Sequence, residues 1–351
     1  MDIMFNQNII KNYFLFYLIY FFSAGCIFSQ IETQFQTSLH NTRAGKNYWY
    51  CAENGGFELL TKMPISQDCI NCHARENAEG STIIHSKYSP SCADCHEKKN
   101  SKVVSDNVCR NCHSHQMAEI RNFKDVHREK GMICIDCHTK SDLHGNGTEL
   151  RSIYEGAIEK TCESCHENIK QSKSHTVHGE KLDCSACHIQ SQVTCFNCHF
   201  ETGKINTGLK DYILLARNKD TKKVQAANFM ALTFKDRTFY VVGPYKAHTV
   251  MKDGRKCSDC HGNSTIRQYE KTKKIILTSW DEKKGKVNNT KGVIPVPDDW
   301  KTAFKIDFIY YDAENKNNNG WSLLKQGADK TQMLFVEPLD GNSMKKLSIK
   351  R

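Results

Sequence analysis

The feature that most constrains this 351-residue chain is a short cysteine–histidine motif that occurs eight times. In each copy two residues separate two cysteines, and a histidine follows the second cysteine directly. Positions i, i+3 and i+4 share one face of a helical turn, so both sulfurs and the imidazole of a motif can meet one flat ligand. The motifs are Cys69, Cys72 and His73; Cys92, Cys95 and His96; Cys109, Cys112 and His113; Cys134, Cys137 and His138; Cys162, Cys165 and His166; Cys184, Cys187 and His188; Cys195, Cys198 and His199; and Cys257, Cys260 and His261.

This C-x-x-C-H pattern is the attachment signal for c-type haem. The cysteines form thioethers with the porphyrin, and the histidine binds the iron. Zinc sites and disulfide frameworks also use paired cysteines, but neither requires a histidine directly after the second cysteine. Every C-x-x-C pair of the chain is followed by histidine. We therefore predict eight covalently attached haem c groups, with the motif histidines as proximal iron ligands.

The histidines outside the motifs are as numerous as the motifs. The chain has sixteen histidines, so eight remain as candidate distal ligands, one for each iron. An iron held by two histidines has no open position and is suited to moving electrons. His40, which is far from any motif, or one of the close pair His175 and His178 is the candidate that we most expect not to bind an iron. The eight candidates are His40, His85, His115, His127, His144, His175, His178 and His248.

The N-terminus indicates export. Residues 1–29 are typical of a secretory signal, in which Lys11 precedes an apolar run over 13–22 that is too short to span a bilayer. An alternative is a lipoprotein signal that ends at Cys26, although Ser23 stands where such signals usually have leucine. We expect a periplasmic protein, or one attached to the outer membrane as a lipoprotein. Lipidation of Cys26 would be its membrane contact.

The formal net charge of +10 does not indicate a nucleic-acid partner. Eight haems would add about sixteen negative propionates and return about eight positive charges from the ferric cores. The oxidised holoprotein would then be close to neutral. We expect no nucleic acid among the partners.

The spacing of the motifs divides the chain into four expected parts. They are a signal over 1–29, a seven-haem region over 30–200, a haem-free β-hairpin insertion over 201–256, and the eighth motif with a mixed C-terminal cap over 257–351. Seven motifs in so short a region leave haem as the main core material. The expected fold is mainly α with much irregular structure, packed around haems. Alternation over 229–234 and 238–242 predicts the hairpin.

One cysteine remains outside the motifs and the signal. Cys51 follows Tyr48, Trp49 and Tyr50. In an exported protein an odd cysteine is a free thiol or an intermolecular link. A thiolate haem ligand and an inert buried thiol both remain open for Cys51.

The motifs, over roughly residues 40–262, resemble those of bacterial multihaem c-type cytochromes. In motif count the chain is more loosely similar to the octahaem group of hydroxylamine oxidoreductase, octahaem nitrite reductase and octahaem tetrathionate reductase. That resemblance implies seven bis-histidine haems and one haem with an open or unusual distal site. This chain departs from the group because no lysine replaces a motif histidine and no motif is widened. It is also shorter than expected for those enzymes.

Two functions follow from these patterns. The preferred one is electron transfer along bis-histidine haems, between a donor such as a quinol dehydrogenase or another cytochrome and a terminal reductase or other acceptor. The alternative is an oxidoreductase with one open catalytic haem that acts on nitrite, hydroxylamine or a sulfur oxyanion such as tetrathionate. The sequence does not identify catalytic residues for it.

Overall fold

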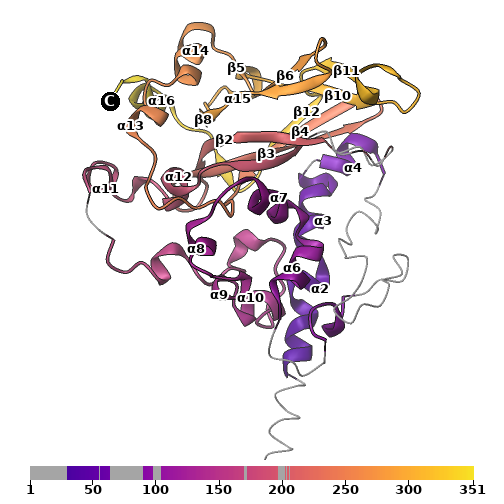
Figure 1. Cartoon of the computed structure of the whole chain (residues 1–351), viewed down its shortest axis with the longest axis vertical. Coiled ribbons are helices and arrows are strands. Elements are labelled where there is room, and N and C mark those ends of the chain that lie inside the picture. The colour runs from indigo at the N-terminus through magenta and orange to yellow at the C-terminus, as the bar shows by residue number, and fades with distance from the viewer. Residues whose placement is uncertain are drawn as a thin grey trace, which may run out of the picture.

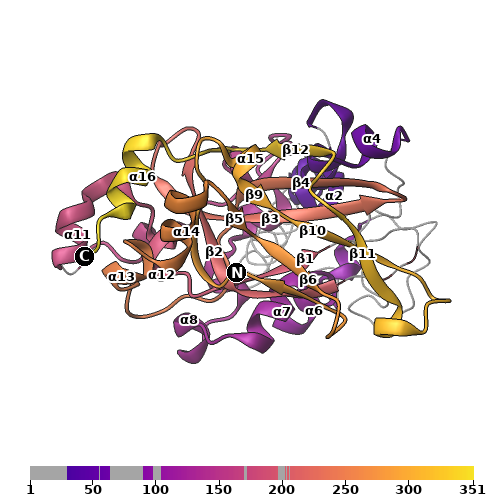
Figure 2. The same cartoon turned by 90° about the horizontal axis from the view of Figure 1, so that it is seen from above.

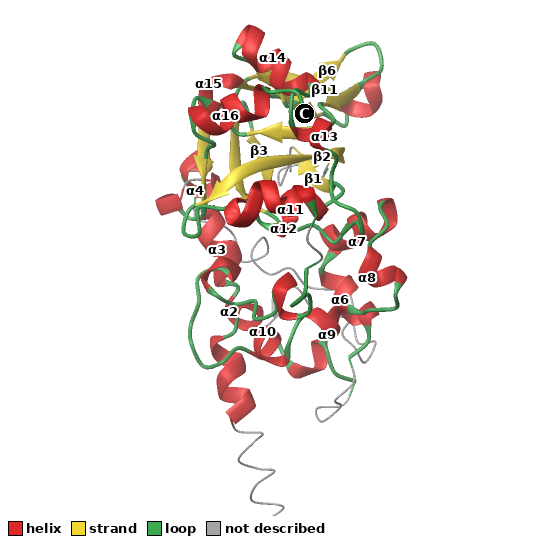
Figure 3. Cartoon of the chain, turned by 90° about the vertical axis from the view of Figure 1, so that its left-hand side faces the viewer, coloured by secondary structure: helices red, strands yellow, loops and turns green. Residues whose placement is uncertain are grey.

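The computed structural model describes residues 30–54, 56–63, 90–97, 104–169, 172–196, 202, 204 and 206–351. In Figure 1 the helices that carry most of the motifs lie below a β-sheet, and the C-terminal elements lie above it. Figure 3 shows the same order from the side, with α2, α6, α9 and α10 at one end and α14, α15 and α16 at the other. The sheet therefore separates a helical half from a C-terminal layer.

The helical half consists of short helices joined by loops. Helices of four to nine residues are too short to be stable alone in water, so their stability depends on what they contact. They are α2 (Leu39–Thr42), α3 (Ala44–Tyr50), α4 (Gly56–Thr61), α6 (Asp106–Cys112), α7 (Ser114–Asn122), α8 (Val126–Glu129), α9 (Cys134–Cys137), α10 (Lys140–His144), α11 (Lys173–His178) and α12 (Cys184–His188). Single 3-10 turns cover Ala52–Asn54, Cys92–Asp94, Ile153–Glu155, Cys162–Ser164 and Gly179–Lys181.

The main sheet has seven strands, with the central order β1-β2-β3-β4-β12 and with β8 and β13 also paired to β2. β8 and β12 pair in parallel with their neighbours, and the other pairings are antiparallel. The strands are β1 (Gln192–Phe196), β2 (Asn206–Asn218), β3 (Val224–Phe234), β4 (Arg237–Pro244), β8 (Gly292–Pro295), β12 (Lys330–Met333) and β13 (Val336–Glu337).

Strands β3 and β4 form an antiparallel hairpin whose register runs from Phe229 opposite Val242 to Phe234 opposite Arg237. Lys235 lies in the turn with a φ of 53°, in the left-handed region. The hairpin expected over 229–242 is therefore present, as the centre of a larger sheet. Because β8, β12 and β13 come from the last sixty residues, the segments over 201–256 and 257–351 build one sheet together.

Both faces of this sheet are covered. On β4, Phe239 and Val241 belong to a small apolar cluster with aromatic side chains of α3, whereas Tyr240 and Val242 point into the main core. Alternation along a strand sends successive side chains to opposite faces. Such a doubly covered strand reads as a continuous buried run, as β4 does from Thr238 to Pro244.

The C-terminal layer has its own small elements, seen from above in Figure 2. The main core includes the fully buried Ile275, Leu277, Ile294 and Phe308. The helices are α13 (Cys257–Cys260), α14 (Ser264–Thr272), α15 (Trp300–Ala303) and α16 (Gly341–Ser348). Two-stranded sheets pair β5 (Ile275–Ile276) with β9 (Phe304–Lys305), β6 (Thr278–Asp281) with β7 (Lys286–Asn289), and β10 (Asp307–Tyr311) with β11 (Trp321–Gln326). Among the described residues, no helix has the length and apolar character needed to cross a membrane.

Candidate haem-ligand centres

The six motifs that lie wholly within the described residues each occupy one short helical turn. In five of them the backbone N–H of the motif histidine donates to the carbonyl of the first cysteine, at 2.8–3.0 Å. This bond closes the turn that brings both sulfurs and the imidazole to one side. The five histidines are His96, His113, His138, His166 and His261.

In three motifs an aspartate directly before the second cysteine caps the start of the motif's own helical turn. Its carboxylate accepts the backbone N–H of the residue that precedes the first cysteine, which satisfies a donor that the turn leaves unpaired. This bond helps each of these motifs to adopt the geometry for attachment. The bonds join Asp94 to Ser91 (2.7 Å), Asp136 to Ile133 (2.7 Å) and Asp259 to Lys256 (2.9 Å).

The structure places each of these six motif histidines opposite one non-motif histidine. No imidazole is shared between two pairs, and partners come from up to 110 positions apart in the chain, as for His138 and His248. The ring centroids are 6.2 Å apart for His40 and His113, 6.1 Å for His96 and His144, 6.0 Å for His127 and His166, 6.3 Å for His138 and His248, 6.4 Å for His175 and His188, and 6.3 Å for His178 and His261.

This spacing fits two imidazoles that share one metal ion. A five-membered ring with bonds of about 1.33 Å has a radius of about 1.1 Å. A bond from a first-row metal to imidazole nitrogen is about 2.0 Å. Two rings on opposite sides of one iron therefore have centroids about 6.2 Å apart. The donor set and its spacing fit a haem iron at each pair.

Several of these imidazoles are neutral at ordinary pH. Burial lowers the pKa of His40 to about 4, and the neighbouring His113 and Arg43 add to the effect. Burial also lowers the pKa of His113, of His138 and of His144. An imidazole must be neutral to bind a metal. These rings are therefore held in the form that iron requires.

In two pairs, at three of the four rings, the second ring nitrogen faces a backbone carbonyl. Nδ1 lies 2.9 Å from the Ser174 oxygen in His178, 3.1 Å from the Met251 oxygen in His188, and 2.8 Å from the Lys346 oxygen in His261. A carbonyl at Nδ1 selects the tautomer with the proton there, which leaves Nε2 as the ligand atom. These carbonyls fix both the tautomer and the ring orientation.

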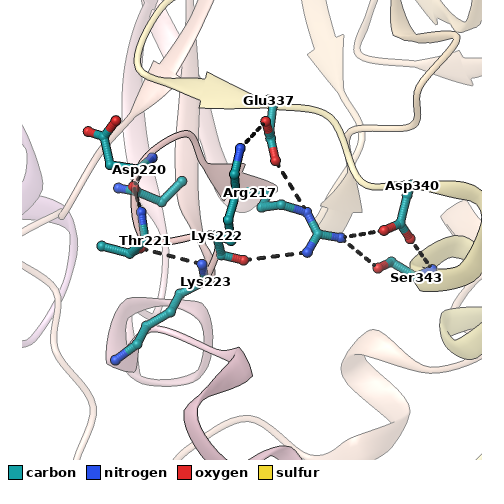
Figure 4. Close-up of polar contacts among 9 residues, drawn as sticks. Arg217, Asp220, Thr221, Lys222, Lys223, Glu337, Asp340 and Ser343 are labelled. Carbon is teal, nitrogen blue, oxygen red and sulfur yellow. Dashed lines mark hydrogen bonds and ion pairs between the residues drawn. The ribbon is translucent and has the colours of Figure 1, made fainter.

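The carbonyl that faces His261 belongs to the C-terminal helix α16, so this segment does more than cover the molecule. The Gly262 N–H also donates to the Leu347 carbonyl at 2.7 Å. At the other end of α16, Arg217 on β2 donates to Asp340 (2.9 Å) and Ser343 (3.0 Å), as Figure 4 shows. The Arg217 side chain thus holds α16 in the position from which it orients His261.

Motifs that follow one another in the chain also lie side by side in space. The Cys109 thiol contacts that of Cys134, and the Cys162 thiol contacts that of Cys184. Longer-range charge interactions between other cysteine side chains extend the series. They join Cys95 with Cys109, Cys137 with Cys165, and Cys187 with Cys257 and Cys260. The spatial order is therefore the second, third, fourth, fifth, sixth and eighth motif.

His115 has different surroundings from the six paired candidates. Its ring stacks on Tyr245 with centroids 5.3 Å apart, and its Nε2 contacts the Val193 carbonyl on β1. The backbone of Cys195 lies in the same strand. The other predicted site residues, which are Cys69, Cys72, His73, His85, Cys198 and His199, lie outside the described residues.

Cys51 ends α3 as its C-terminal cap. Its Sγ lies 3.5 Å from the Tyr48 carbonyl and 3.4 Å from the Asn54 side-chain nitrogen. The described cysteines, Cys51 included, form no disulfide with one another. Among the described residues, no group of three or more histidine, cysteine, aspartate or glutamate side chains gathers as a metal cluster. Paired histidines are the ligand arrangement that this part of the chain presents.

Comparison with known proteins gives one partial similarity. The chain is 28% identical over 93 residues to the dissimilatory sulfite reductase MccA of Wolinella succinogenes. The match covers 22% of this chain and 13% of the relative, so it spans only a small part of that enzyme. No family model and no solved structure matches the chain.

Proposed function

We propose that this protein is an exported multihaem c-type cytochrome that passes electrons along a chain of bis-histidine haems. The observation that carries the proposal is the set of six histidine pairs with ring centroids 6.0–6.4 Å apart. Each pair joins a motif histidine to a non-motif histidine. An iron between two such rings would have no position for a substrate.

The residues present suit haem c. In each described pair the motif cysteines would hold the porphyrin, and the two histidines would hold the iron. A bound haem supplies an iron that alternates between the ferric and ferrous states. The remaining work falls to the protein, which sets the spacing, the ligands and the exposure of each site to solvent. With the first and seventh motifs included, we propose eight haems.

The spatial order of the motifs supports a conducting role. The second to sixth motifs and the eighth form one series of neighbours, in which His40 lies close enough to His138 and His144 for their charges to lower its pKa further. The short chain segments between motifs leave the sites adjacent. We propose that electrons enter from a quinol dehydrogenase or another cytochrome and leave to a terminal reductase. We also propose a periplasmic location, with lipidation of Cys26 as the alternative.

A haem count and an EPR spectrum of the oxidised holoprotein test this function. Mass spectrometry should give eight haems, and the described pairs should contribute low-spin ferric signals. His175→Ala should convert one low-spin haem to high spin, since His175 is an exposed residue of α11 whose ring lies opposite that of His188. If that variant kept the full low-spin signal, the assignment of the pairs would be wrong.

A second function is favoured by one observation and one similarity. His115 contacts the Val193 carbonyl and Tyr245 rather than a described motif histidine, and the relative in the comparison is a sulfite reductase. An iron without a distal histidine would leave a position for a sulfur oxyanion such as sulfite or tetrathionate, for nitrite or for hydroxylamine.

His115→Ala separates the two functions. In the electron-transfer protein His115 is a ligand, so its removal should create a new high-spin signal. In the reductase the wild-type protein already shows one high-spin haem, and the variant leaves the number of low-spin haems unchanged. Reductant-driven consumption of sulfite, tetrathionate, nitrite or hydroxylamine by the wild-type protein would then identify the substrate.

A further inference from the structure

Both histidines of one pair have a carboxylate beside the ring nitrogen that faces away from the pair's partner. Oε2 of Glu119 lies 3.5 Å from Nδ1 of His248, and Oδ2 of Asp142 lies 3.9 Å from Nδ1 of His138. No other pair among the described residues has an acidic side chain within 4 Å of both rings. In another pair one ring has an acidic neighbour, since Asp125 lies 3.6 Å from Nδ1 of His127.

The two carboxylates are held in place by their own hydrogen bonds. Glu119 is fully buried on α7 and accepts the Tyr245 hydroxyl at 2.8 Å and the His248 backbone N–H at 2.9 Å. The Asp142 side chain is 1% exposed and accepts the backbone N–H of Thr139 at 2.9 Å and of Glu159 at 3.0 Å. Each carboxylate therefore stays beside its histidine.

The neighbouring pairs have the opposite surroundings. Arg43 and Lys46 place positive charge near His40 and His113, and Lys140 places positive charge near His144. Nδ1 of His40, of His96, of His144 and of His248 is buried and makes no hydrogen bond to the described residues, so the difference at His248 is the charge of Glu119 at 3.5 Å. The sign of the nearby charge thus changes between adjacent sites.

Negative charge beside an axial histidine favours the ferric over the ferrous state, because the oxidised site carries one more positive charge. We infer that Glu119 and Asp142 give the site between His138 and His248 the lowest reduction potential of the six described pairs. Asp125 should give the site between His127 and His166 the next lowest reduction potential. This inference rests on the proposed function, since it requires iron at each pair.

The position of this site gives the inference a consequence for electron flow. The fourth motif, which carries His138, lies between the third and the fifth in the spatial order. A site of lowest potential in the middle of the series is the last to be reduced. Electrons therefore reside on the sites at either side of it, and the pair of carboxylates acts as a thermodynamic step that divides the chain.

Glu119→Gln and Asp142→Asn test the inference in the intact holoprotein by potentiometric titration monitored by EPR. Each substitution removes one negative charge with little change in shape. In each variant we expect the reduction equilibrium of this site to shift about tenfold toward the ferrous state. The lowest midpoint potential should therefore rise by about 59 mV for one electron. Asp236→Asn is the matched control, because Asp236 is exposed in the β3–β4 turn and lies far from the pairs. It should leave every midpoint in place.

The outcomes separate this inference from the proposed function. If the haem count and low-spin signals are retained but neither variant raises the lowest midpoint above the control, the inference is overturned while the function stands. If low-spin bis-histidine signals are absent from the wild type, the proposed function fails first. Should Glu119→Gln not assemble, Asp142→Asn tests the same site from the opposite ring. Asp142→Glu keeps the negative charge, so its lowest midpoint potential should equal that of the wild type.

Discussion

The helical half and the sheet half of this protein differ in how many apolar side chains they bury. From β1 onward the chain buries many large apolar side chains, Leu214, Ile294 and Phe308 among them. Between residues 90 and 185, the described part of the chain buries no hydrophobic side chain fully. Six large aliphatic residues there are exposed instead. They are Ile133, Ile135, Ile153, Ile158, Ile169 and Val177.

The contrast indicates what each half requires to fold. Burial of apolar area is the dominant favourable contribution to folding, and the sheet half obtains it from its own sequence. The helical half has short helices and caps but no comparable apolar core. Its exposed aliphatic side chains and six histidine pairs surround the places where we propose porphyrin. The cofactor, rather than the chain, would supply that core.

Production of the chain without haem attachment should show the difference between the two halves most clearly. We expect the region over 104–188 to lose its structure, because its helices are too short to persist alone. The region over 206–351 should keep its own, because its core is aliphatic and aromatic. Hydrogen exchange would show protection in the second region and almost none in the first. Equal protection in both regions would contradict the assignment of haem as the core of the helical half.

Phe308→Ala should destabilise the sheet half by about 3–5 kcal/mol, since it leaves a cavity in a closely packed core. Phe308 is fully buried and its ring lies 6.3 Å from that of Phe196. The matched control is Leu323→Ala on the neighbouring strand, where the side chain is 38% exposed and the cost should stay near 0.5 kcal/mol. Chemical denaturation followed by far-UV circular dichroism measures both. A similar loss in the two variants would show that burial is not what distinguishes Phe308.

Sequence patterns predicted the local structure of the motifs better than the architecture around them. The motifs are local, so the turns of the six described motifs follow from spacing and from caps such as Asp136. The hairpin over 229–242 is also local, and it lies where alternation placed it. The seven-stranded sheet could not be predicted in this way, because β8, β12 and β13 pair with strands that lie about 80 to 120 positions earlier.

The partners of the histidines show the same limit. Counting predicted one distal candidate for each motif, but not that His40 faces His113 or that His248 faces His138. Those pairs depend on tertiary contacts such as the one through which Asp125 accepts the Val250 N–H at 2.7 Å. The sequence also did not predict that the Lys346 carbonyl orients His261, because every residue has a backbone carbonyl whatever its type. Only the basic composition of the tail was apparent.

Asp106→Asn should lower the stability of the helical half by about 2 kcal/mol at neutral pH. Burial alone would raise the pKa of Asp106, but the Cys134 backbone N–H and the Arg128 guanidinium lower it. A carboxyl with a depressed pKa stabilises the fold above about pH 4, and the stabilisation is lost as the pH falls toward 2. Denaturation from pH 6 to pH 2 should therefore show a steeper loss in the wild type than in the variant. Parallel curves would mean that Asp106 does not link the third and fourth motifs energetically.

Arg217→Met should have the smallest effect on stability and the most local effect on a haem site. The Arg217 side chain is 20% exposed and Asp340 is 60% exposed, so screening limits the loss to about 1 kcal/mol. Loosening of α16 should nevertheless shift the Lys346 carbonyl away from Nδ1 of His261. We expect the EPR signal of that one site to change while the others stay fixed.

Arg151→Met is the matched control, because Arg151 pairs with Glu155 on the surface of the helical half at 65% exposure and faces none of the paired rings. Its EPR spectrum should equal that of the wild type. If Arg217→Met also left the spectrum unchanged while hydrogen exchange showed α16 loosened, the Lys346 carbonyl would not control His261. The sheet half would then only support the eighth site mechanically. A change confined to the His261 site would instead show that a helix without an attachment motif sets the properties of a haem ligand through one backbone carbonyl.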